Sequence, residues 1–100
     1  MKMVYLGRYS RTKDDMRFSE IQAFATYELA KAWVKKAIDD EVALQEDLGN
    51  LQKFNGIWHF KGERVATFPN TITDTRLDLN DGWGDSVQIC IQSIELQGGE

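Results

Sequence analysis

One segment constrains the fold of this chain more than any other. Between Phe24 and Ile38 the apolar side chains recur at the spacing of an α-helix. They form one stripe and a second row beside it, which consist of Leu29, Trp33 and Ala37 and of Ala30, Val34 and Ile38. Such a pattern is typical of a helix that packs one face on a neighbouring element. We therefore expect one amphipathic helix as a layer of the fold.

The flanking residues predict where this helix begins and ends. Thr26 is a candidate N-cap, because its hydroxyl can accept a hydrogen bond from an orphan amide, and Glu28 suits the positive end of the helix dipole. Gly49 suits the C′ position. The expected helix covers residues 27–48, and the acidic run 39–41 marks the point where it would divide.

Outside this segment the apolar residues alternate in short runs, which indicates strands. One hairpin is expected from 3–9 and 18–24. A second is expected from 51–54 and 57–60 around Asn55-Gly56, a pair that suits a type I′ turn. Further strands are expected over 64–68 and 86–96, the last with a bulge near Gln92 that would bring Ile94 and Leu96 onto the face of Val87. Residues 69–85 show no clear period and predict a long loop.

These elements predict a single α+β domain over residues 1–100. Its antiparallel sheet would have about five strands with the helix packed on one face, in the order ββαβββ. The chain has 42% hydrophobic residues and no apolar run long enough for a membrane span. The apolar stretch at its start is too short for a signal peptide. The lone Cys90 forms no internal disulfide, which is typical of a cytoplasmic protein.

The inventory of reactive side chains predicts a protein that is not an enzyme. Nucleophilic catalysis needs a nucleophile within reach of a base, and the chain has a single histidine, His59, and a single cysteine, Cys90. His59 is expected to face solvent and Cys90 to be a small packed thiol. One histidine and one cysteine do not complete a zinc site. The loop from Asp78 departs from the EF-hand spacing at its glycine and at its twelfth position, so no metal or cofactor is predicted.

The net charge of −4 is unevenly distributed. Residues 39–50 hold five acidic residues and no basic one, and residues 70–100 hold six against one arginine. The ordinary interpretation is a solvated surface that keeps the protein soluble. The alternative is a pair of acidic patches that steer the protein onto a basic partner. The predicted partner-binding residues are Asp39, Asp40, Glu41, Asp74, Asp78, Asp81, Trp83 and Asp85.

Two aromatic features leave alternatives open. Trp83 lies between two glycines, where it would be either a core residue or an anchor inside an acidic rim. Phe54, Trp58 and Phe60 lie on a locally basic hairpin and could stack single-stranded bases, although the net negative charge opposes phosphate binding. Self-association through an exposed sheet edge is a third hypothesis, and the chain would be a monomer or a homodimer.

The hairpin that runs into residues 23–33 and the closing strand that ends at Ile94-Glu95-Leu96 resemble small acidic phage and prophage accessory proteins. The resemblance covers about a third of the chain. It implies no catalytic residues and points to proteins that inhibit host machinery, such as anti-CRISPR or anti-restriction proteins. Toxin-immunity proteins are a second possibility. The resulting hypothesis is a protein-binding inhibitor whose acidic surface docks a basic, nucleic-acid-handling protein.

Overall fold

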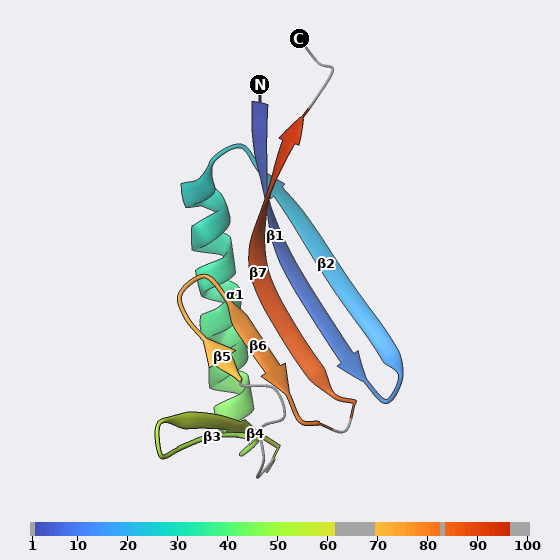
Figure 1. The fold of residues 1–100 in the computed structure, drawn as a ribbon, viewed down its shortest axis with the longest axis vertical. Coiled ribbons are helices and arrows are strands. Elements are labelled where there is room, and N and C mark those ends of the chain that lie inside the picture. The colour runs from blue at the N-terminus through green and yellow to red at the C-terminus, as the bar shows by residue number, and fades with distance from the viewer. Residues whose placement is uncertain (1, 62–69, 83, 97–100) are drawn as a thin grey trace.

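The computed structural model describes residues 2–61, 70–82 and 84–96. One helix, α1 (Tyr27–Asp47), packs on one face of a five-stranded antiparallel sheet with the order β2-β1-β7-β6-β5 (Figure 1). The strands of this sheet are β1 (Lys2–Lys13), β2 (Met16–Phe24), β5 (Thr71–Ile72), β6 (Leu77–Asn80) and β7 (Ser86–Leu96). A separate hairpin of β3 (Leu51–Phe54) and β4 (Ile57–Phe60) follows the helix. The predicted α+β class is confirmed.

The helix has the predicted ends but does not divide. The Thr26 hydroxyl accepts a hydrogen bond from the Leu29 backbone N–H at 3.3 Å, and Gly49 has a φ of +75° beyond the C-cap. The acidic run 39–41 continues the helix, because Asp39 and Asp40 pair with lysines one turn earlier and Glu41 turns inward. The predicted break is therefore wrong.

Residues 70–82 contain more strand than their sequence predicts. The expected strand 64–68 lies outside the described residues. The expected long loop contains β5 and β6, and Leu77 and Leu79 of β6 are buried beside Ile89 and Val87 of β7. A strand of four residues is too short for its alternation to stand out from turn residues on both sides.

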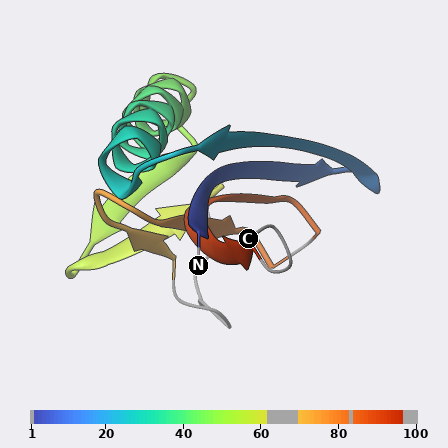
Figure 2. The same cartoon turned by 90° about the horizontal axis from the view of Figure 1, so that it is seen from above.

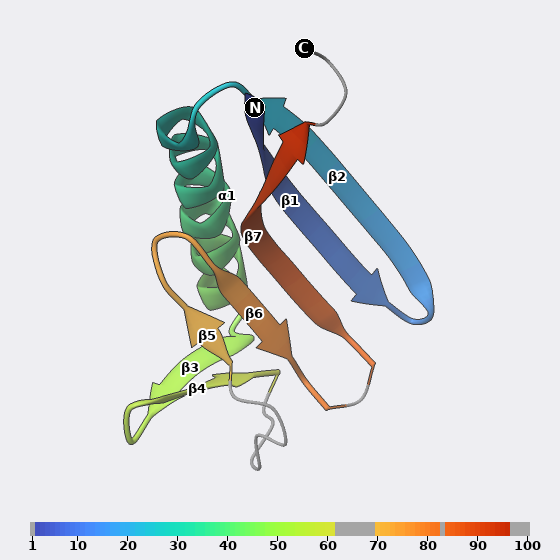
Figure 3. The ribbon, with the colours of Figure 1, turned by 45° about the horizontal axis from the view of Figure 1, so that its top comes forward.

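The predicted bulge in the last strand is also wrong. β1 and β7 pair without interruption from Lys2 opposite Leu96 to Thr12 opposite Ser86. Ile94 and Leu96 remain on the face away from α1 and are exposed. The two strands continue past β6 as a ribbon in which they twist about each other, as Figures 1 and 3 show.

The hydrophobic core lies between α1, the sheet and the second hairpin. Its members have less than a tenth of their surface exposed and are Val34, Ile38, Leu51, Phe60, Leu77, Leu79, Val87 and Ile89. Seen from above, α1 covers one face of the sheet and leaves the other open (Figure 2). The row Ala30-Val34-Ile38 is the buried one, whereas Leu29 is 56% exposed. The buried face is thus one residue away from the stripe that the sequence predicts.

Trp33 packs at the margin of this core over a glycine. Its indole lies beside Phe24, with ring centroids 6.1 Å apart, and rests directly on Gly7 of β1. A Cβ atom at position 7 would overlap with the six-membered ring of the indole. Gly7 therefore allows the helix to approach the sheet closely at this point.

Replacing Gly7 by alanine tests this contact. We expect Gly7→Ala to lower the free energy of unfolding by about 1–3 kcal/mol, since the indole must move out of a packed position. Chemical denaturation measures the loss. In a Trp33→Leu background the same substitution should cost much less, because the smaller side chain leaves room for the methyl group. Equal costs in both backgrounds would contradict the contact.

Candidate functional site

An open groove lies between the C-terminal half of α1 and the turn that joins β5 to β6. Ile38, Val42 and Ile72 give it an apolar floor. Its rim carries four exposed carboxylates, from Asp39, Glu46, Asp47 and Asp74. The fold thus brings together residues from the two acidic segments 39–50 and 70–100, which were expected to form separate patches. We call this feature the acidic groove.

The end of α1 makes the acidic groove unusually negative. The last turn of α1 contains Glu46 and Asp47 and no basic residue. The C-terminal end of a helix carries a partial negative charge, so carboxylates there are unfavourable and cations are favoured. Glu46 and Asp47 were not among the predicted partner-binding residues. The lack of a basic residue near the expected helix end was the sequence signal that could have identified them. A positively charged group bound here would relieve the repulsion.

Lys35 is the cation that the described residues place beside this rim. Its Nζ lies 2.9 Å from Asp39 Oδ2, and both side chains are at least half exposed. The hydrogen bond to Asp39 raises the pKa of Lys35, and the charges of Asp39 and Asp74 add to this effect. An exposed pair of this kind exchanges readily with water and with other charges. Among the four rim carboxylates, Lys35 forms its ion pair with Asp39.

Asp40 belongs to another side of the helix. It pairs with Lys36 at 2.7 Å and lines a separate depression beside Trp33 and Leu44. The hydrogen bond to Asp40 raises the pKa of Lys36. Asp40 is therefore exposed, as a docking residue must be, but it does not border the acidic groove.

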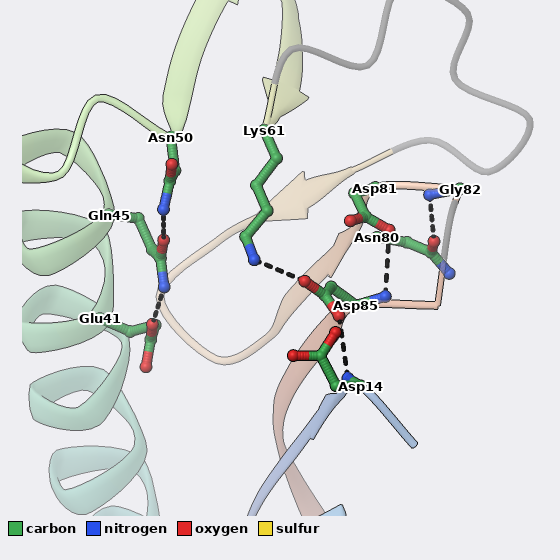
Figure 4. Close-up of polar contacts among 9 residues, drawn as sticks. All are labelled: Asp14, Glu41, Gln45, Asn50, Lys61, Asn80, Asp81, Gly82 and Asp85. Carbon is green, nitrogen blue, oxygen red and sulfur yellow. Dashed lines mark hydrogen bonds and ion pairs between the residues drawn. The ribbon is translucent and has the colours of Figure 1, made fainter. Parts of the chain in front are cut away.

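Glu41 is a structural residue and does not belong to an exposed acidic surface. It is 5% exposed and accepts hydrogen bonds from Tyr9 Oη at 2.8 Å and from an Arg11 Nη atom at 2.6 Å. The Gln45 amide also donates to Glu41, and Asn50 donates to Gln45 (Figure 4). This network connects α1 to β1 and to the start of β3. The expectation that Glu41 contacts a partner is incorrect for this reason.

The Asp78–Asp85 segment is largely occupied by internal contacts. Asp78 pairs with Arg76 at 2.7 Å, and Asp85 pairs with Lys61 at 2.6 Å while accepting from the Asp14 backbone N–H. Asp81 is 5% exposed and accepts from the Asp85 backbone N–H (Figure 4). The hydrogen bond to Lys61 holds the pKa of Asp85 below its usual value. These carboxylates tie loops together, and Trp83 lies outside the described residues.

The three aromatic residues of the second hairpin do not form one stacking platform. Phe60 is 1% exposed in the core. Trp58 is partly buried against the core, with Lys53 Nζ 5.5 Å from its ring centroid. Only Phe54 is strongly exposed, at 67%. The aromatic pattern in the sequence thus divides between a core residue, a margin residue and a surface residue.

Comparisons of the chain with protein-family models, with curated proteins and with solved structures find no match. Among residues 2–61, 70–82 and 84–96 no three His, Cys, Asp or Glu side chains are arranged to hold a metal ion. In the same part of the chain no helix is long and apolar enough to cross a membrane. The resemblance to phage accessory proteins remains a prediction.

The structural role of Glu41 predicts a large effect of a small change. Glu41→Gln keeps the shape of the side chain but leaves Arg11 without its counter-charge, so we expect a loss of about 2–4 kcal/mol in the free energy of unfolding. Asp40→Asn, at the adjacent exposed position, should leave stability almost unchanged. Denaturant titration measures both variants, and equal effects would contradict the burial of Glu41.

Tyr9 predicts a loss of stability at alkaline pH. Burial, together with the hydrogen bond to Glu41, raises the pKa of Tyr9 to about 12 from an ordinary value of 10.0. Between these values the folded state keeps a proton that the unfolded state has released, so the free energy of unfolding falls as the pH rises. In denaturant titrations across this interval, Tyr9→Phe should show a shallower fall than the unmodified protein. An identical slope would contradict the prediction.

Proposed function

We propose that this protein is a non-catalytic inhibitor or accessory protein that docks a basic protein partner through the acidic groove. The observation that supports this most is the position of Glu46 and Asp47. They stand at the negative end of α1 and line the same groove as Asp74, over an apolar floor. Stability alone disfavours this arrangement, and residues that break a local rule without an internal compensation are often functional.

The groove suits a lysine or arginine side chain better than a small anion or a phosphate backbone. A basic side chain can place its charged head among the rim carboxylates and its aliphatic stem along Val42 and Ile72. Complementary charge of this kind accelerates association and selects the partner. Proteins that handle nucleic acid present such basic surfaces to bind phosphates, which supports a partner of that class.

The cytoplasmic location in this proposal rests on the lone Cys90. The remaining finer parts rest on the sequence resemblance, and they are a phage counter-defence role of the anti-CRISPR or anti-restriction type and the toxin-immunity alternative. These roles share one physical requirement, which is an acidic surface that occupies a basic one. A test of the groove therefore applies to each of them.

A second candidate is single-stranded nucleic-acid binding by the β3–β4 hairpin. The exposure of Phe54 and the position of Lys53 over the Trp58 ring favour it. The burial of Phe60 and the net charge of −4 oppose it. Micromolar, salt-sensitive binding of single-stranded DNA that Phe54→Ala abolishes would favour this candidate over the docking proposal.

The docking proposal can be tested with a peptide rich in lysine, arginine and leucine. The triple variant Glu46→Gln/Asp47→Asn/Asp74→Asn should weaken binding by at least about tenfold at low ionic strength, because it removes the rim charge. The matched control is Asp15→Asn/Glu20→Gln/Glu95→Gln, which removes the same net charge from exposed positions elsewhere. Isothermal titration calorimetry measures both, and equal weakening would show that binding depends on net charge alone.

A further inference from the structure

The sheet has one long edge that lacks most of the usual protection, although Arg17 and Glu20 place two charges on it. β5 at one edge has two residues, whereas β2 at the other has nine and, in the described part of the chain, pairs only with β1. β2 contains no proline and no lysine, and it pairs with β1 without a bulge. Proteins commonly protect edge strands by these devices, because the unpaired backbone groups are a template for another strand. Figure 3 shows β2 as the outermost strand of the sheet.

The other unpaired stretch of the sheet is different in shape. Beyond Ile89, β7 pairs with β1 but no longer with β6. There the two strands twist about each other, which turns their edge away from the plane of the sheet (Figure 1). β2 therefore offers the flatter and longer template.

β2 also exposes large apolar side chains on both of its faces. Met16 is 77% and Phe18 is 58% exposed on the face that α1 occupies, and Ile21 is 53% exposed on the open face. An exposed apolar strand at a sheet edge is a predicted site of strand addition. Burial of these apolar side chains against another strand would therefore be favourable.

The turn before β2 determines which backbone groups point outward. Asp14 and Asp15 form a two-residue turn with φ values of 51° and 64°, so Lys13 and Met16 form the hydrogen-bonded pair that closes the hairpin. Along an antiparallel pair, hydrogen-bonded residues alternate with residues whose amides point away from the partner strand. The outward-pointing residues of β2 are therefore Arg17, Ser19, Ile21 and Ala23.

We propose that β2 pairs antiparallel with β2 of a second copy of this chain, around a twofold axis at Ile21. An axis at Glu20 would place two carboxylates directly opposite each other, which destabilises a sheet. An axis at Ser19 would place Phe18 opposite a glutamate. With the axis at Ile21, the two Ile21 side chains face each other, Phe18 faces Phe24 and Glu20 faces Gln22.

This pairing joins two five-stranded sheets into one and is independent of the docking proposal. The axis is perpendicular to the sheet, so both helices lie on the same side. The acidic groove borders β5, at the opposite edge of the sheet from β2. Both grooves of the dimer therefore remain open, and the dimer would present two docking sites to a partner.

Sedimentation velocity over a wide concentration range tests the association. We expect the unmodified protein to form a dimer and Ile21→Lys to be monomeric but still folded, with an unchanged circular dichroism spectrum, because position 21 is exposed in the monomer. The control Gln88→Lys places the same charge on the same open face, but on β7 where this strand pairs on both sides, and should remain dimeric. A protein that is monomeric at every concentration, or a dimer that Ile21→Lys does not dissociate, would overturn the proposal.

Cysteine cross-linking tests the register. In a Cys90→Ser background, the single variants Arg17→Cys, Ser19→Cys and Ile21→Cys place a thiol at successive outward-pointing positions. A residue on the twofold axis meets its own copy, so mild oxidation should give the highest disulfide yield for Ile21→Cys. A maximum at another position, or no cross-linked dimer for any variant, would contradict the proposed pairing.

Discussion

The buried carboxylate of Glu41 determines how the layers of this protein fit together. Tyr9 and Arg11 of β1 donate hydrogen bonds to it, and so does Gln45 from the next turn of α1. Asn50 donates in turn to Gln45. A buried charge is tolerated only when such partners surround it. The network therefore fixes the rotation of α1 on the sheet. That rotation directs Val34 and Ile38 into the core and leaves Glu46 and Asp47 beside the β5–β6 turn.

The same constraint sorts the acidic residues into two classes. Glu41, Asp78 and Asp85 connect separate elements through ion pairs or hydrogen bonds, and Asp81 accepts a hydrogen bond within the β6–β7 loop. On the rim of the acidic groove, Glu46 and Asp47 carry negative charge at the C-terminal end of α1, where the helix dipole disfavours it. A sum of charges over the sequence does not separate these classes, because both consist of aspartate and glutamate. The fold separates them through burial and through the cations that each carboxylate meets.

The parts of the fold that depend on local signals were predictable from the sequence. Thr26 caps the helix, and Asn55 and Gly56 have the positive φ values of a hairpin turn. The parts that depend on distant partners were not. Glu41 is buried because of β1 residues about thirty positions earlier in the chain, as its contacts with Tyr9 and Arg11 show. Lys61 and Asp85 likewise pair across the sequence. The residues next to Glu41, Lys61 and Asp85 in the sequence do not indicate these contacts.

The most direct test of the docking account is to map where a cationic ligand contacts the protein. In a titration of the isotopically labelled protein with a polylysine peptide, followed by heteronuclear NMR, we expect the largest shifts of the backbone amides at residues 38–47 and 72–74. Within these segments the groove is lined by Ile38, Asp39, Val42, Ala43, Glu46, Asp47, Ile72, Thr73 and Asp74. Shifts concentrated at residues 78–85, or spread evenly over every acidic segment, would contradict the claim that cationic ligands bind in the acidic groove.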